Sequence, residues 1–290
     1  MEKTLEAAAL AARRNLFIAL HRLGGGHFGA CLSEIDILTY LYFEEMNIRP
    51  EEPDWPKRDR FVLSKGHGGF GLYSVLAKRG FFSPERLWTY ENGVMLPKHA
   101  DRHRVPGVDV STGSLGQGLS IACGMALAAK RDGSGVRVFA LLGDGECNEG
   151  QIWEAAMFAA KYKLDNLIAA VDANGLQFDG RSEDIMPMES LTEKWKAFGW
   201  DVQEAGGHDF GSIRSAYRAA CGREHSDNGL PADGKNRRPK MIVFRTVKGK
   251  GISFMENRTN WHSGNCNEEE LREGCRQLGI GFSELGGEGI

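Results

Sequence analysis

The sequence lacks a long apolar segment, a surplus of basic residues and closely spaced cysteines. No apolar run approaches the roughly 20 residues that a membrane-spanning helix needs. The formal net charge of −3 leaves no basic excess to attract nucleic acid, and there is no block of like charges long enough to form an interaction tail. These absences argue against a membrane protein and against a nucleic-acid-binding protein.

The six cysteines are scattered, and no two of them form a Cys-x-x-Cys pair. In a chain of 290 residues this pattern indicates free thiols in a reducing compartment. Residues 1–6 carry acids and continue into an amphipathic helical pattern, which is unlike a secretion signal. We therefore expect a cytoplasmic protein.

The composition that is present, 41% hydrophobic and 26% charged, is ordinary for a globular protein. A helix is expected over 5–23, and a second is expected to begin at Ser33, with Asp36 as the acidic partner of a capping box. Further along the chain, short apolar runs alternate with helical patterns. The expected strands cover 61–63, 136–142, 167–171, 200–203 and 241–246.

This alternation predicts an α/β fold in which a parallel sheet is flanked by helices on both faces. We expect one domain over residues 1–290. Within it, residues 223–239 are polar and predict a surface excursion, and residues 265–290 predict a weakly ordered tail.

Two polar residues follow two of the expected strands. Asp144 lies between two glycines just after the run 136–142, and Asn174 follows the run 167–171. An open parallel sheet places its ligands at the carboxyl ends of its strands. Two oxygen ligands there suit Mg²⁺ or Ca²⁺ holding a phosphorylated cofactor. An Asp between glycines is also common in an ordinary turn, so the second element is needed to favour a metal site.

Four histidines stand in or beside loops near glycines: His27, His67, His99 and His262. Any one of them alone is more often a hydrogen-bonded structural residue. Together they indicate a polar pocket that could bind oxyanions or move protons near neutral pH. They do not show the spacing of a zinc site.

Three glycine-containing segments have weaker signals. The Gly-x-Gly-x-x-Gly pattern at 24–29 follows a helical segment, so it lacks the strand that a dinucleotide site requires. The loop 111–118 could bring backbone N–H groups close to a ligand, or could form a tight turn against a neighbouring helix. Lys248, after the last strand, could reach a phosphate or a substrate oxygen, or could be a solvated surface lysine.

Gly143-Asp144-Gly145, with Asn174 at this separation, resembles the thiamine diphosphate signature. Other segments, in the same order along the chain, resemble the transketolase family specifically. They are FVLSKGHG at 61–68, GVDVSTGSLGQG at 107–118, GDGECNEGQIWEA at 143–155, KLDNL at 163–167 and TVKGKG at 246–251.

The resemblance implies a divalent cation, Mg²⁺ or alternatively Ca²⁺ or Mn²⁺, held by Asp144 and Asn174 through side-chain oxygens and by Leu176 through its carbonyl. It also implies that Gly145 donates its backbone N–H to the cofactor's diphosphate. Further cofactor contacts are implied at His67, Gly113, Ser114, Leu115, Glu146, Lys248 and His262.

The same resemblance implies that His27, His99 and His262 are catalytic. His27 and His99 would face substrate hydroxyls and help to move protons. Glu149 and Glu154 resemble acids that lie at the subunit interface in this family.

Two departures from the family pattern concern the substrate side of the site. The family often has Ser-Gly-His-Pro-Gly where this chain has Gly-Gly-His-Phe-Gly at 25–29, so Phe28 is expected to reshape the substrate mouth. It also has Pro where this chain has Ser114.

The resemblance covers only the first part of a full-length transketolase, and the pyrimidine-binding domain is absent. It therefore implies an N-terminal subunit of a split transketolase that needs a C-terminal partner, in an α₂β₂ assembly. Its substrates would be a ketose and an aldose, free or phosphorylated. Two alternatives remain open: a subunit of another thiamine diphosphate enzyme, of the 2-oxo-acid dehydrogenase or deoxyxylulose-phosphate synthase type, and a non-catalytic scaffold subunit.

Overall fold

A computed structural model describes residues 2–89, 95–188, 190–222 and 237–285. The fold is built on a five-stranded sheet in the order β1-β2-β3-β5-β4. All neighbouring strands run parallel. The strands are β1 (Arg60–Leu63), β2 (Val138–Gly143), β3 (Leu167–Ala173), β4 (Asp201–Gly206) and β5 (Lys240–Arg245).

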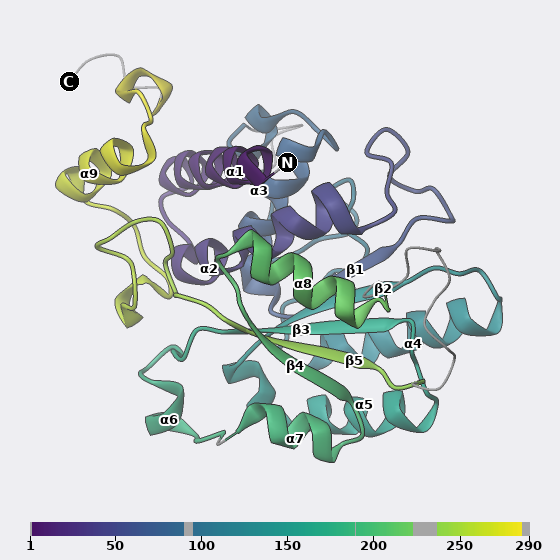
Figure 1. The fold of residues 1–290 in the computed structure, drawn as a ribbon. Coiled ribbons are helices and arrows are strands. Elements are labelled where there is room, and N and C mark those ends of the chain that lie inside the picture. Colours follow the sequence, from purple (N-terminus) through teal and green to yellow (C-terminus); the bar gives the residue numbers. More distant parts are fainter. Residues whose placement is uncertain (1, 90–94, 189, 223–236, 286–290) are drawn as a thin grey trace.

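Helices cover both faces of this sheet (Figure 1). One face carries α1 (Glu2–Arg22), α2 (Phe28–Tyr40), α3 (Gly69–Arg79) and α8 (Phe210–Ala220). The other carries α4 (Gln117–Arg131), α5 (Gly150–Lys161) and α7 (Leu191–Ala197). The short α6 (Ser182–Ile185) and the outlying α9 (Glu268–Leu278) complete the α-helices of the described residues. The predicted α/β fold with helices on both faces is confirmed.

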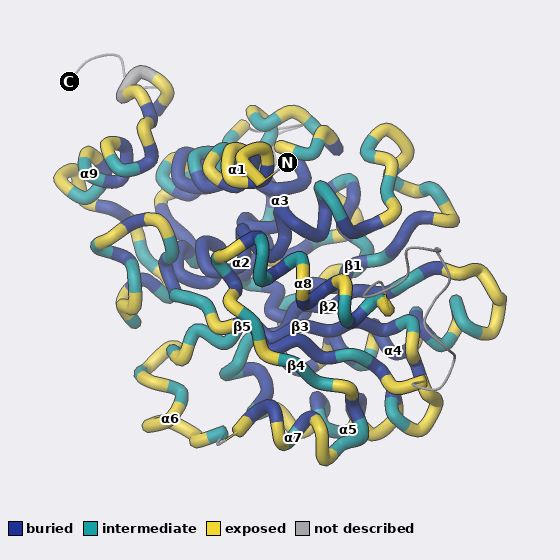
Figure 2. The backbone as a smooth tube through the Cα atoms, in the orientation of Figure 1, coloured by how far each residue is buried: buried dark blue, intermediate teal, exposed yellow. Residues whose placement is uncertain are grey.

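The side chains of the central strands alternate between two hydrophobic clusters. In β2, Phe139 and Leu141 pack with the helices around α1, whereas Val138 and Ala140 pack with α4 and α5. Successive residues of a strand point to opposite faces, so a strand covered on both sides must be apolar throughout. Figure 2 shows β1, β2, β3 and β5 as mostly buried strands, whereas the edge strand β4 is more exposed.

The start of α2 differs from the prediction. The helix begins at Phe28, after His27, so Ser33 and Asp36 lie inside it instead of capping it. The Ser33 hydroxyl donates to Asp172, and Asp36 pairs with Arg13 at 2.6 Å. Short polar residues favour caps, but here buried tertiary partners outweigh that preference.

The chain end also differs from the prediction. Helix α9 forms within the segment expected to be a weakly ordered tail, because Asn267 and Glu270 make a capping box and Leu271, Cys275 and Leu278 are buried. Most of the expected polar excursion, residues 223–236, lies outside the described residues. In the described part of the chain, no helix has the length and apolar character needed to cross a bilayer.

Candidate active site

The register of the sheet brings the two predicted metal ligands together. Gly143 of β2 pairs with Asp172 of β3, so Asp144 and Asn174 follow adjacent strands at the same edge. The backbone N–H of Asp144 donates to the carbonyl of Asp172 at 3.3 Å. Both residues line a cavity of about 440 Å³ at this edge.

Most of the residues singled out in the sequence meet in this cavity. Its lining contains His27, His67, His99, Gly113, Leu115, Asp144, Gly145, Glu146, Glu149, Asn174, Leu176, Lys248 and His262. They come from the loops after β1, β2, β3 and β5, from the start of α2 and from the loop before α4. Ser114 and Glu154 are exposed and do not line it.

Asp144 is half-buried, and the donors that reach its carboxylate are neutral. It accepts from the backbone N–H of Gly145 at 2.9 Å and of Gly175 at 2.7 Å, and from the Ser182 hydroxyl at 3.2 Å. Burial, and then the nearby charge of Asp172, raise the pKa of Asp144. A carboxylate in such surroundings is stabilised by a cation.

Lys248 supplies positive charge near the Asn174 loop. Its ammonium lies 3.5 Å from the Leu176 carbonyl and 3.2 Å from the Gln177 carbonyl, and 3.1 Å from Nδ1 of His262. Burial lowers the pKa of Lys248 to about 8. The side chain is buried in the site and is not the solvated surface lysine of the alternative interpretation.

Three histidine rings cluster around the ring of His27. Its ring centroid lies 5.5 Å from that of His67, 5.6 Å from that of His99 and 5.7 Å from that of His262. Burial, followed by neighbouring cationic groups, lowers the pKa of His27 to about 4, of His262 to about 4 and of His67 to about 2. These three imidazoles are therefore neutral near pH 7 and can each accept one hydrogen bond.

A buried charged cluster supports the floor of the site. The Lys65 ammonium lies 2.5 Å from the Asp172 carboxylate and 2.8 Å from that of Glu34. Asp172 also accepts hydrogen bonds from Ser33 and Thr246. The sequence analysis missed this cluster, although an aspartate in an apolar strand needs a buried partner.

Glu146 joins the loop before α4 to the strands. One carboxylate oxygen accepts from the Ser64 hydroxyl at 2.6 Å and from the N–H of Gly116 at 2.9 Å. The other accepts from the N–H of Gly143 at 3.1 Å. Glu146 therefore shapes the cavity that it also lines, and its expected role as a cofactor contact stays a prediction.

Phe28 does not reach the cavity. Its ring is fully buried and lies 5.9 Å from the ring of Phe17 and 5.8 Å from that of Trp261. The expectation that Phe28 reshapes the substrate mouth is therefore wrong, because the first turn of α2 directs this side chain into the core.

Two further lining residues were not predicted. Phe178 is 63% exposed, and its ring lies 4.9 Å from that of His262. Gln177 precedes it in the chain. The Gln177 side chain packs closely against Gly145, because a Cβ added at Gly145 would lie 2.9 Å from Cγ of Gln177. Their only signal in the sequence is their position in the loop after Asn174.

The residues present fit a diphosphate and its cation. Asp144, Asn174 and the Leu176 carbonyl offer the hard oxygen atoms that Mg²⁺ prefers. Three buried polar atoms that line the cavity have no hydrogen-bond partner among the described residues: Nδ1 of His27, Oδ1 of Asn148 and Nε2 of Gln177. Buried polar atoms are normally paired, so their state is consistent with a bound polar ligand.

Comparisons with known proteins agree with this geometry. Residues 6–284 match the family described as "Transketolase, thiamine diphosphate binding domain". The chain is 47% identical over 258 residues to the 6-deoxy-6-sulfo-D-fructose transketolase subunit SqwG of Clostridium sp. (strain MSTE9), covering 89% of this chain and 90% of that protein. It is 40% identical to an apulose-4-phosphate transketolase subunit of Phocaeicola vulgatus, covering 98% of this chain and 96% of that protein.

A solved structure is similar as well. The transketolase from Leishmania mexicana superposes with a TM-score of 0.83 at 29% identity. The match covers 95% of this chain but only 41% of that enzyme. The chain therefore belongs to the transketolase family and corresponds to its N-terminal, thiamine diphosphate-binding part.

Proposed function

We propose that this chain is the N-terminal subunit of a two-subunit transketolase that uses thiamine diphosphate and Mg²⁺ to transfer a two-carbon ketol unit from a ketose to an aldose. The observation that carries the proposal is one cavity at the carboxyl ends of the strands. It contains the oxygen atoms of Asp144 and Asn174, the Lys248 ammonium and the four clustered histidines.

The cation would be held by Asp144, Asn174 and the carbonyl of Leu176. It would offset the charge of the diphosphate, which the neighbouring Lys248 would further compensate. His67, His262 and the backbone of Gly145 would contact the diphosphate, and Gly113 and Leu115 would lie beside the aminopyrimidine ring. When bound, thiamine diphosphate supplies the nucleophilic carbon and the electron sink for breaking a carbon–carbon bond beside a carbonyl.

The chain's own chemical contribution is to hold the substrate and to move its protons. His27 is neutral at pH 7, so its ring can accept a hydrogen bond or a proton from a substrate hydroxyl. His99, with its ring 5.6 Å away, would position a second hydroxyl. His262 would serve both the diphosphate and the substrate side.

A partner subunit would complete the site. The match to 41% of the Leishmania enzyme leaves the rest of a full-length transketolase without a counterpart here. The apolar side chains Met157 and Phe158 of α5, and Tyr162 just after it, are exposed, which supports a covered face in an assembly. We propose an α₂β₂ arrangement in which Glu149 and Glu154 approach the interface and the partner supplies the pyrimidine-binding domain.

The names of the relatives narrow the substrate class. One is named for a sulfosugar and another for a sugar phosphate. We therefore propose that the donor is a ketose with an anionic group at its far end, and that the acceptor is an aldose or an aldose phosphate.

The test is ketol transfer by this chain reconstituted with a C-terminal subunit, across a panel of phosphorylated, sulfonated and neutral sugars. We expect turnover only with both subunits, thiamine diphosphate and Mg²⁺ present. The matched pair of variants is His27→Ala in the cavity and His21→Ala outside it, with only the first expected to lose most of the activity. Full-rate transfer by this chain alone would refute the two-subunit proposal.

A further inference from the structure

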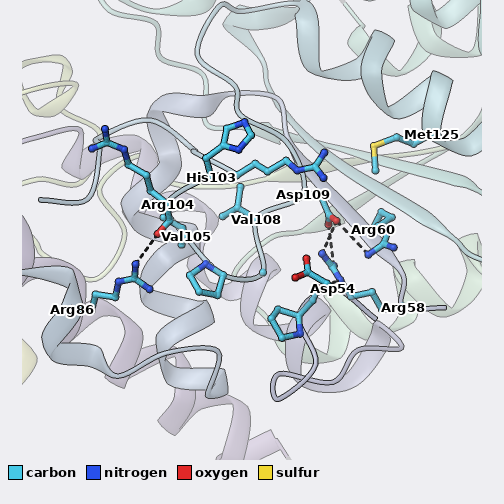
Figure 3. A pocket seen from close by; sticks show the side chains of 14 residues that line it. Asp54, Arg58, Arg60, Arg86, His103, Arg104, Val105, Val108, Asp109 and Met125 are labelled. Atoms are coloured by element: carbon cyan, nitrogen blue, oxygen red, sulfur yellow. Dashed lines mark hydrogen bonds and ion pairs between the residues drawn. The ribbon is translucent and has the colours of Figure 1, made fainter. Parts of the chain in front are cut away.

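A second cavity, of about 570 Å³, is drawn in Figure 3 with the side chains that line it. It shares no lining residue with the cavity of the candidate active site, which contains the four histidines and which we call the histidine-lined cavity. Its walls come from the segment 53–58 and the first residue of β1, the turn Pro84–Leu87, the loop 102–109 and one residue of α4, Met125. Five arginines line it: Arg58, Arg60, Arg86, Arg102 and Arg104.

The charge of this cavity contrasts with that of the chain. Two aspartates, Asp54 and Asp109, also line it, so its five arginines outnumber its acids, whereas the whole chain carries a formal net charge of −3. A concave surface that concentrates one sign of charge raises the local concentration of ions of the opposite sign. We propose that this cavity, which we call the arginine pocket, binds a small phosphate-bearing anion.

One wall of the arginine pocket is rigidly built. Arg58 is buried and donates to both oxygens of Asp109, at 3.1 Å and 2.6 Å. Asp109 in turn accepts from the backbone N–H of Phe61 in β1 at 2.9 Å. This bidentate pair ties the loop 102–109 to the edge strand, so Arg58 acts as scaffold.

Packing and a hydrogen bond fix the backbone of the loop 102–109. Gly107 has φ +86°, and a Cβ there would lie 2.6 Å from the Phe81 ring. Val105 and Val108 are buried beneath it, and the Arg104 carbonyl accepts from Arg86 at 3.0 Å. The arginines are therefore presented on a fixed backbone, which lowers the entropic cost of binding an anion.

Arg60, Arg102 and Arg104 lie among more cationic than acidic side chains. Arg60 lies 3.6 Å from Asp109, which Arg58 already pairs at 2.6 Å. Burial, and then the charge of Arg58, lower the pKa of Arg60, and Arg102 also contributes. Across the described ranges, the guanidinium groups of Arg102 and Arg104 have no carboxylate partner. A phosphate dianion would supply the missing counter-charge, and guanidinium groups match its geometry.

The size of the cavity suits a small metabolite. Ligand sites of about 300–1,000 Å³ are typical for small molecules. The shared chemistry is a phosphate group, which could come from free phosphate or from a phosphate monoester.

Binding can be followed by NMR of the full chain with ¹³C-methyl-labelled methionine. The methyl signal of Met125 reports on the arginine pocket, because Met125 lines this pocket and not the histidine-lined cavity. Its signal is assigned with Met125→Leu and followed during titration with inorganic phosphate or glycerol 3-phosphate at constant low ionic strength. We expect a saturable shift of Met125 and none of Met255, which is fully buried elsewhere. Tighter binding of the ester assigns the pocket to a phosphorylated metabolite, and equal binding assigns it to free phosphate.

The decisive variant is Arg102→Ala/Arg104→Ala. Both side chains are exposed, so we expect the fold to survive, as checked by circular dichroism. The loss of two charge-assisted contacts should weaken binding by at least roughly tenfold. The matched control, Arg131→Ala/Arg276→Ala, removes the same charge from exposed positions outside the pocket and should bind as the parent does.

Three results would overturn the proposal: no saturable shift of Met125, equal weakening in the control, or unchanged binding in Arg102→Ala/Arg104→Ala. If that variant instead keeps its phosphate affinity but associates less tightly with the C-terminal subunit, the pocket is a protein-docking surface and the small-anion proposal is wrong.

Discussion

The ammonium of Lys65 lies 2.5 Å from the carboxylate of Asp172, and both side chains are almost completely buried. Lys65 follows β1 and Asp172 belongs to β3, so the pair connects two strands that are separated by β2. Burial would lower the pKa of Lys65, but the charges of Asp172 and Glu34 outweigh it and raise that pKa. This pair holds the base of the strand ends from which Asp144 and Asn174 project.

We predict that Lys65→Met strongly destabilises the protein, because it leaves Asp172 with a buried, uncompensated charge. The free energy of unfolding should fall by about 3–5 kcal/mol. Denaturant unfolding followed by circular dichroism measures the change. Lys130→Met, which breaks the partly exposed pair with Asp165, is the control and should cost less than about 1 kcal/mol. Similar losses in the two variants would contradict the assigned role of Lys65.

Glu34 should make stability depend on pH. Burial raises the pKa of Glu34 to about 8, above its ordinary value of 4.5. The folded state therefore binds a proton that the unfolded state releases between these pH values, and the free energy of unfolding falls as pH rises from about 4.5 to 8. In Glu34→Gln this part of the decline should disappear. Denaturant unfolding at pH 5, 6, 7 and 8 tests this, and parallel profiles for parent and variant would show that Glu34 does not titrate in this range.

Asp144→Asn should separate cofactor binding from folding. The amide keeps one oxygen for the N–H groups of Gly145 or Gly175 but removes the charge that a cation needs. We expect Mg²⁺-dependent binding of thiamine diphosphate to weaken on the order of a hundredfold, with an unfolding free energy close to that of the parent. Calorimetric titration with and without EDTA measures the effect. The control is Asp165→Asn, on the surface after α5. Parent-like affinity in Asp144→Asn would mean that Asp144 does not bind the cation.

Two glycines of α4 should respond oppositely to alanine. A Cβ on Gly118 would lie 2.6 Å from Cα of Ser64, so Gly118→Ala must push the helix start away from β1. A Cβ on Gly124 would meet nothing within 4 Å, so Gly124→Ala should stabilise the isolated chain by about 0.5–1 kcal/mol through helix propensity. Thermal unfolding of both variants compares them. Equal stability would mean that the contact between Gly118 and Ser64 relaxes without cost.

Several features followed from local sequence patterns. Apolar runs bounded by polar residues marked β2 and β3, and their ends marked Asp144 and Asn174. The capping-box expectation for Ser33 and Asp36 was wrong, because these side chains find buried partners in β3 and α1 that lie far away in the chain. The expectation for Phe28 was wrong for a related reason. A departure from the family's residue pattern does not show in which direction the first turn of a helix points its side chains.

The sequence by itself determined the α/β class, the place of Asp144 and Asn174 at two strand ends and the family to which the chain belongs, since each depends on residues that are close together in the chain. The tertiary structure alone decided the cluster of Lys65, Asp172 and Glu34, the gathering of three histidines around His27 and the arginine pocket. In each of these, the groups come from segments tens of residues apart. Their burial and charge arise only when the parallel register and the packed helices bring those segments together.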